Sequence, residues 1–304
     1  MNDGFEYRAV VGPEAAGRTV LGHLVARYRH SSEDVWRERI ASGQVRLDEA
    51  TATAADRLRP GQSLVWRRPP WEEPAAPLAF AVLHRDEHLL AVAKPRGLPT
   101  LPNGGFLDHT LLHLVRRLAP EAVPLHRLGR GTSGLVLFAR TDEARRTLSR
   151  AWRDGGVEKT YRGLVAGTPD REAFSIEVPI GRVPHPRLGH VHAAAQGGKR
   201  AVSHVRVLAG REGAALVEVT IPTGRPHQIR IHLAAAGHPL VGDPLYGIGG
   251  VPVPEPGLPG DPGYWLHAHR LRLEHPVTAA PLLLECAPPP ILRLGEQSGR
   301  HEKD

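Results

Sequence analysis

The sequence predicts an α+β protein with a small first unit and a larger, strand-rich second unit. Residues 1–70 alternate short helical and strand patterns, whereas from residue 78 onward most apolar runs are short and typical of strands. The run 68–74 is rich in proline and charge, so it can continue neither a helix nor a central strand. We therefore expect a first unit over 1–70, a linker over 71–77, a second unit over 78–290 and a polar tail over 291–304.

The composition excludes several protein classes. Apolar residues at 41% and charged residues at 23% exclude wholesale disorder. The single cysteine, Cys286, excludes an internal disulfide and a multi-cysteine zinc cage. The chain has no apolar run long enough for a transmembrane helix and begins without a secretory signal pattern, so we expect a cytoplasmic protein.

The net charge of +7 comes from 35 arginines and only four lysines. Such a charge indicates a polyanionic partner. A GC-rich coding sequence would also raise the arginine content. The net charge therefore indicates a polyanionic partner only if arginines also occur at specific positions within motifs.

The first unit is expected to contain two helices and two strands. The spacing of Leu21, Leu24 and Val25 predicts a helix over 19–28. Serine and acidic residues at 31–34 are typical of a helix start, so a second helix is expected to begin there. Gly43 is expected to end this helix. Short strands are expected at 44–48 and 63–67.

The second unit is expected to be mostly strand. Asp108 is the expected N-cap of one helix, Thr141 caps another, and Pro226 opens a third that ends before Gly237. Residues 247–263 hold six glycines and five prolines, which predicts an irregular loop. The strands are expected at 78–83, 89–94, 135–139, 157–166, 202–208 and 215–221.

Residues 129–134 match the dinucleotide-binding pattern G-x-G-x-x-G, but the context argues against that function. The pattern requires a following helix whose N-terminus holds the pyrophosphate. Here a β-rich run, 135–139, follows instead. The 18 histidines contain no H-E-x-x-H motif, so we expect no metal site.

Three arginine-bearing segments carry the strongest functional signal: 126–135, 158–162 and 223–247. Each mixes basic residues with glycine turns or an aromatic residue. Scattered solubility charges would not cluster in this way, so the segments favour a groove for phosphates.

At these segments the sequence resembles the RluA-type family of RNA pseudouridine synthases, over nearly the whole chain. The similar stretches are 86–98, 126–135, 159–161, 223–233 and 237–247, with 266–268 and 275–276 beyond them. The resemblance implies a mixed, largely antiparallel central sheet with flanking helices, and isomerisation of uridine without cofactor or metal. Residues 14–67 resemble the small S4 RNA-binding module, with Asp48 and Glu49 in place of its usual Asn-Gly turn.

The resemblance also implies roles for individual residues. Tyr161 would stack on the flipped base, Arg230 would pair with a catalytic aspartate, and Arg127 would help to push the uridine out of its helix. The further residues expected to bind RNA are His126, Arg130, Thr132, Lys159, Arg225 and His227.

One position departs from the family. The family's nucleophile is the aspartate of a His-Arg-Leu-Asp motif, and Gly129 occupies that place here. A carboxylate can attack or stabilise the sugar cation, whereas glycine offers only backbone and can adopt a positive φ that changes the loop. Arg230 would then need another partner, such as a phosphate, a water or another acid. The flanking acids are Asp108, Asp142 and Asp243.

Two functions follow, and a third is kept as an alternative. The chain isomerises uridine in ribosomal or transfer RNA, as the retained Tyr161, Arg230 and Arg127 indicate, or it is a catalytically inactive RNA-binding homologue, as Gly129 indicates. A nicotinamide-nucleotide enzyme is the third. The expected partner is RNA, with no membrane, metal or cofactor, and a monomer is expected.

Overall fold

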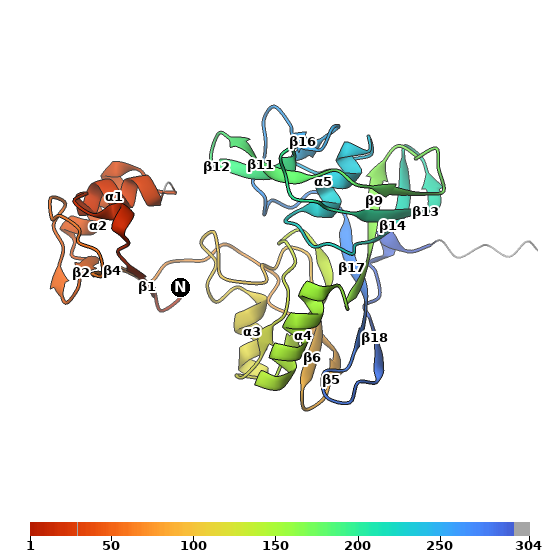
Figure 1. Ribbon diagram of the computed structural model, residues 1–304, viewed down its shortest axis with the longest axis horizontal. Helices are drawn as coiled ribbons and strands as arrows, with labels where there is room; N and C mark the ends of the chain where they lie inside the picture. The colour runs from red at the N-terminus through yellow and green to blue at the C-terminus, as the bar shows by residue number, and fades with distance from the viewer. Residues whose placement is uncertain (29, 295–304) are drawn as a thin grey trace, which may run out of the picture. The chain divides into compact units, whose positions relative to one another are not determined.

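The computed structural model describes residues 1–28 and 30–294 and divides into two compact units, Met1–Glu73 and Pro74–Asp304 (Figure 1). The boundary falls after Glu73, inside the segment 71–77. Most of the expected polar tail, 295–304, lies outside the described residues. None of the helices in the described part of the chain has the length and apolarity that a membrane crossing requires.

The first unit is a four-stranded antiparallel sheet, ordered β1-β4-β2-β3, with two helices. The side chains of Thr19 and Ser32 cap the two helices by accepting hydrogen bonds from Gly22 N and Val35 N. Trp36 and Leu24 are buried in its core. The elements are β1 (Phe5–Val10), α1 (Val20–Arg27), α2 (Glu33–Ala41), β2 (Val45–Leu47), β3 (Ala50–Thr51) and β4 (Ser63–Arg68).

The second unit is built on a ten-stranded sheet, which confirms the predicted α+β fold with a mixed, largely antiparallel sheet. Its main path is β10-β13-β14-β9-β17-β8-β6-β5, with β18 paired to β17 and β7 paired to β8. The strands are β5 (Ala81–Arg85), β6 (Leu89–Lys94), β7 (Val123–Pro124), β8 (Ser133–Ala139), β9 (Glu158–Ala166), β10 (Ala173–Ile176), β13 (Ser203–Arg211), β14 (Ala214–Thr220), β17 (Leu266–Glu274) and β18 (Pro281–Glu285).

Helices and two small hairpins complete the second unit (Figure 1). The helices α3 (Leu111–Leu118) and α4 (Asp142–Asp154) lie beside the half of the sheet that contains β5 and β6, and α5 (Gln228–Ala235) lies beside the other half. The hairpin strands are β11 (Ile180–His185), β12 (Gly189–Ala194), β15 (Tyr246–Gly247) and β16 (Val251–Pro252).

The two halves of the sheet meet at a short parallel pair between β8 and β17. Gly134 at the start of β8 has φ +113°, and a Cβ there would collide with the backbone of Ala268. Only glycine permits this close approach of the two strands. The approach brings the loop before β8 next to the loop before β17, and the pocket described below forms there.

Three local predictions were wrong in detail. The N-cap of α3 is Thr110, whose Oγ1 accepts a hydrogen bond from His113 N, and not Asp108. Helix α5 begins at Gln228, because His227 adopts a left-handed conformation with φ 55° and interrupts the helix after Pro226. The loop 247–263 is not wholly irregular, since it contains β16.

Candidate active site

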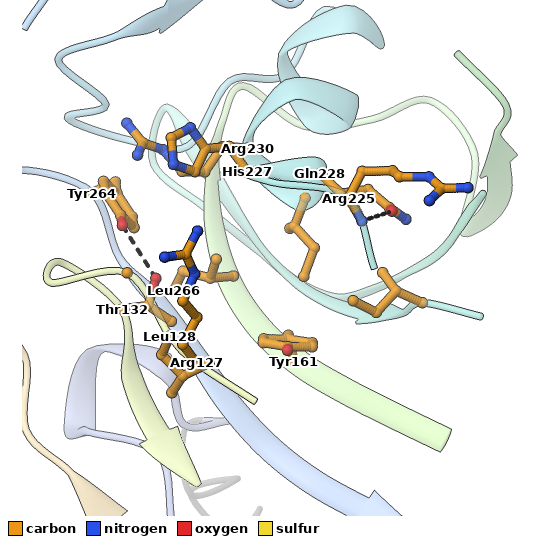
Figure 2. A pocket seen from close by; sticks show the side chains of 13 residues that line it. Arg127, Leu128, Thr132, Tyr161, Arg225, His227, Gln228, Arg230, Tyr264 and Leu266 are labelled. Carbon is orange, nitrogen blue, oxygen red and sulfur yellow. Dashed lines mark hydrogen bonds between the residues drawn. The ribbon is translucent and has the colours of Figure 1, made fainter. Parts of the chain in front are cut away.

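A pocket of about 120 Å³ lies where the loop before β8, strand β9 and helix α5 converge (Figure 2). Its volume is well below the roughly 300–1,000 Å³ typical of small-molecule sites, so it has room for little more than one planar ring. Arg127, Tyr161 and Arg230, which come from the three arginine-bearing segments, all line it. The full lining is Arg127, Leu128, Gly129, Thr132, Tyr161, Ile221, Arg225, His227, Gln228, Ile229, Arg230, Tyr264 and Leu266.

Arg230 is held by a buried, two-point ion pair with Asp243. Its Nε and Nη2 donate to Oδ2 and Oδ1 of Asp243, each at 2.7 Å, and its Nη1 donates to the Pro259 carbonyl at 2.9 Å. The two side chains are only 3% and 1% exposed. Burial lowers the pKa of Arg230, but the Asp243 carboxylate, together with Tyr264 and Tyr246, more than offsets burial and leaves the pKa raised. The partner that Arg230 was expected to need is therefore Asp243.

The Asp243 carboxylate also holds the backbone of the residues that follow it. Asp243 Oδ1 also accepts hydrogen bonds from the backbone N–H groups of Leu245 and Tyr246. The guanidinium carbon of Arg230 lies 5.0 Å from the ring centre of Tyr246 and 4.2 Å from that of Tyr264. Each oxygen of Asp243 accepts at least one hydrogen bond, so this acid acts as an ion-pair partner of Arg230. It is not among the residues that line the pocket.

His227 is fixed by a hydrogen-bond relay. The Tyr246 hydroxyl donates to the His192 carbonyl at 2.7 Å, so its oxygen accepts from His227 Nδ1, also at 2.7 Å. Burial, reinforced by the nearby charge of Arg230, lowers the pKa of His227 to about 3. A neutral ring with its proton on Nδ1 leaves Nε2 as a hydrogen-bond acceptor, and His227 is among the residues that line the pocket.

The backbone that precedes α5 is held by the side chain of Gln228. Its Oε1 accepts hydrogen bonds from Arg225 N and Thr223 Oγ1, and its Nε2 donates to the Val202 carbonyl and to Ser203 Oγ. These four bonds satisfy the whole amide and fix the entry to the helix. They hold the chain just before the left-handed turn at His227, after which α5 begins.

Gly129 lies beside a pair of hydroxyl groups. Thr132 Oγ1 and Tyr264 Oη are 3.1 Å apart (Figure 2). A Cβ built on Gly129 would lie 3.2 Å from Tyr264 Oη and 3.7 Å from Thr132 Oγ1. Gly129 does not use the left-handed φ that the sequence suggested it could, so its backbone conformation is open to other residues. A Cβ there requires Tyr264 Oη to move by a few tenths of an ångström.

Tyr161 and Arg127 differ in their surroundings. Burial raises the pKa of the Tyr161 hydroxyl to about 12, so the phenol is neutral near pH 7. Arg127 is exposed, and Figure 2 shows its side chain beside the same space that the Tyr161 ring borders. The pocket thus combines a flat apolar ring with a solvent-facing cation.

Three of the residues expected to bind RNA do not line the pocket. His126 stacks on Trp152 and its Nε2 accepts a hydrogen bond from Leu137 N, while burial lowers its pKa to about 3. Lys159 is 5% exposed and burial lowers its pKa. Arg130 donates to the Gly260 carbonyl at 2.8 Å and so ties two loops together. The remaining residues, Thr132, Arg225 and His227, do line the pocket.

Sequence reasoning missed Tyr264, which is 1% exposed and touches both Thr132 and Arg230. Its only signal was an aromatic residue at the end of a glycine- and proline-rich loop. The other two flanking acids are elsewhere: Asp108 pairs with His113 and Asp142 with Arg145. Among the described residues that line the pocket none is a carboxylate, and no cluster of three metal-ligating side chains occurs in the described part of the chain.

The chain is similar to known proteins over most of its length. The family described as RNA pseudouridylate synthase matches residues 88–235. An uncharacterised RNA pseudouridine synthase of Synechocystis is 46% identical over 276 residues, which cover 90% of this chain and 95% of that protein. The ribosomal large subunit pseudouridine synthase D of Nitrosomonas europaea is 34% identical, over 87% of this chain and 78% of its own.

A solved structure shares the fold. The human protein RNA pseudouridylate synthase domain containing 1 superposes with a TM-score of 0.56 and 26% identity. The superposition covers 73% of this chain and 89% of the human chain.

Proposed function

The chain belongs to the RNA pseudouridylate synthase family, and from this premise we propose that it isomerises uridine to pseudouridine in structured RNA, ribosomal or transfer. The observation that carries the proposal is the pocket that unites Arg127, Tyr161 and Arg230. Ribosomal RNA is favoured because a relative with 34% identity is named for the large ribosomal subunit. We also propose that the chain acts as a monomer in the cytoplasm.

The reaction rearranges one nucleotide without gaining or losing an atom. The C1′–N1 bond breaks, the uracil turns, and a C1′–C5 bond forms. C5 then releases its hydrogen as a proton, and N1 carries a proton in the product. The base must leave its stack first, since its reacting atoms are hidden within a helix.

The pocket residues suit the steps that surround this exchange. The small volume matches a single flipped base, and the neutral Tyr161 ring offers a flat face to it. Arg127 offers a solvent-facing cation to the displaced strand. The acceptor atom Nε2 of His227 can take a hydrogen bond from a uracil N–H, which fixes the orientation of the turned base.

The missing nucleophile motivates a second function. By the family resemblance, position 129 would carry the aspartate, and no carboxylate is among the described lining residues. A protein that keeps the RNA pocket without chemistry accounts for this observation. An isomerase must instead take its acid or base from elsewhere, since Asp243 is fully engaged with Arg230 and the backbone.

One assay separates the two functions. RNA labelled with tritium at C5 of uridine releases tritium to water when pseudouridine forms, because C5 loses its hydrogen. The isomerase proposal predicts release by the purified wild-type protein on rRNA transcripts. Complete absence of release, together with tight RNA binding, would favour the binding function.

The variant Gly129→Asp tests the second function by placing a carboxylate at position 129. A Cβ at this position requires Tyr264 Oη to move by a few tenths of an ångström, so a thermal melt of the variant is measured beside its activity. If the pocket is otherwise competent, the variant gains at least about tenfold in tritium release, about 1.4 kcal/mol in activation free energy. Gly129→Asn is the matched control, because it has nearly the same shape and lacks the charge.

A further inference from the structure

The first unit contains a cavity of about 280 Å³ that the proposed chemistry does not use. It lies between α2 and the segment that follows β4, entirely within Met1–Glu73. Its lining is rich in arginine and tryptophan for so small a unit. The lining residues are Val35, Glu38, Arg39, Gln44, Trp66, Arg68, Pro69, Pro70 and Trp71.

Two guanidinium groups in this lining are stacked on indole rings. The guanidinium carbon of Arg39 lies 4.4 Å from the ring centre of Trp66 and 4.7 Å from that of Trp36. The guanidinium carbon of Arg68 lies 3.4 Å from the ring centre of Trp71. Stacking holds a guanidinium in place by its flat face and leaves its edge N–H groups free to donate.

These two arginines differ from their neighbours in sequence. Arg37 pairs with Glu33 at 2.6 Å, and Arg67 pairs with Glu6 at 2.9 Å. Among the described residues, no carboxylate forms an ion pair with Arg39 or Arg68. The protein hydrogen bond of the Arg39 guanidinium goes to Ser31 Oγ at 2.9 Å.

The two cations also influence each other. Burial and then the charge of Arg68 lower the pKa of Arg39, whereas the charge of Glu38 raises it. Arg39 and Arg68 line the same cavity, so their like charges repel. An anion bound between two like charges in one cavity would relieve their repulsion. Glu38, an exposed acid in the same lining, reduces the net charge of the cavity but makes no ion pair with either arginine in the described structure.

We propose that Arg39 and Arg68 form a binding site for a phosphodiester of RNA. A phosphate offers several acceptor oxygens, which matches two guanidinium edges better than a single carboxylate does. The surrounding tryptophans keep the site partly dry and strengthen the contact. The inference rests on the proposed function, which supplies RNA as the polyanion, and it places part of the RNA affinity outside the active-site pocket.

The test uses the full chain and a fluorescein-labelled, uridine-containing RNA hairpin. Fluorescence anisotropy over a series of salt concentrations gives both the affinity and its salt slope. Arg39→Gln should weaken binding about tenfold and reduce the slope by about 0.7–0.9, the value for one lost phosphate contact. Arg68→Gln should do the same, so that misfolding of one variant leaves the other to decide.

Matched variants distinguish a site from a general loss of charge. Arg37→Gln removes the same charge from the same helix, but Arg37 is exposed and paired with Glu33, so we expect less than about a twofold change. Glu38→Gln should strengthen binding, because it removes the acid from the cavity. Arg39→Lys keeps the charge and loses the planar fork, so it should fall between wild type and Arg39→Gln.

Equal effects of Arg37→Gln and Arg39→Gln would overturn the proposal, as would unchanged salt slopes in both Arg39→Gln and Arg68→Gln. Displacement of the hairpin by poly-glutamate as readily as by poly-uridylate, at equal charge, would also overturn it in favour of an acidic protein partner. These measurements need no product. A protein that binds RNA through Arg39 and Arg68 but forms no pseudouridine would therefore refute the proposed function alone.

Discussion

Replacement of Asp243 by asparagine should destabilise the second unit far more than the loss of an exposed carboxylate does. The Asp243 carboxylate accepts hydrogen bonds from Arg230 at 2.7 Å and 2.7 Å, from Leu245 N at 2.9 Å and from Tyr246 N at 3.1 Å. Asparagine has nearly the same shape, but it cancels the charge and turns one acceptor into an NH2 group. Arg230, whose side chain is 3% exposed, is then a buried cation without a counter-ion.

The burial of Arg230 sets the expected loss in the free energy of unfolding. Breaking a buried ion pair by removing one partner costs about 3–5 kcal/mol. For a unit of this size each kcal/mol lowers Tm by roughly 2–4 °C, so the transition of the second unit should fall by about 6–20 °C. Differential scanning calorimetry is the suitable assay, because three of the five tryptophans lie in the first unit and would dominate a fluorescence signal.

Two further variants test whether the lost stability comes from the unpaired Arg230 cation. Asp142→Asn breaks an exposed pair with Arg145 and should cost less than about 1 kcal/mol. Adding Arg230→Met to Asp243→Asn removes the unpaired cation and should recover most of the lost stability. A loss for Asp243→Asn no larger than that for Asp142→Asn, or a double variant no more stable than the single one, would contradict the account of this ion pair.

Three other predictions concern Tyr161 in the pocket, His126 and the first unit. Tyr161→Phe keeps the aromatic ring and should retain RNA affinity within about threefold. Tyr161→Ala should weaken RNA binding about tenfold or more, because one base–aromatic stack contributes about 1–3 kcal/mol. Equal losses of affinity in the two variants, measured by fluorescence anisotropy, would refute stacking. Burial lowers the pKa of His126 from 6.5 to about 3, so between these pH values the unfolded chain binds more protons than the folded chain. The free energy of unfolding should therefore fall as the pH drops from 6.5 toward 3, by up to about 1.4 kcal/mol per pH unit for this group. Urea denaturation of His126→Gln should show a shallower fall with pH, and an unchanged slope would contradict the assignment. Deletion of residues 1–70 should weaken RNA binding and flatten its salt dependence, and unchanged affinity would count against an RNA-binding first unit.

Local sequence signals predicted much of the fold. Thr141 does cap α4, with its Oγ1 accepting from Ala144 N, and the apolar run at 135–139 is part of β8, which confirms the argument against a dinucleotide-binding motif. These features depend on neighbours in sequence, so pattern reasoning finds them. Strand β1 was not predicted, although Phe5, Tyr7 and Ala9 alternate with Glu6 and Arg8; it is a short edge strand with nearly all side chains exposed.

The site was predicted less completely than the fold. The segments that bear Arg127, Tyr161 and Arg230 were identified from sequence, because their glycine and arginine patterns are local. The contact of Tyr264 with Thr132 depends on how the loops before β8 and β17 approach each other across the sheet. The Arg230–Asp243 pair joins α5 to the turn that follows it, 13 residues further along the chain. No local pattern encodes that approach, and Asp243 was only one of three flanking acids.

The most direct test of the central claim is a map of pseudouridines in the ribosomal and transfer RNA of cells with and without this gene. The proposed isomerase predicts at least one uridine that is pseudouridine only when the gene is present, and that the purified protein converts again in RNA from the deletion strain. No difference between the two maps would contradict the proposal and favour an RNA-binding protein that has lost its carboxylate at position 129.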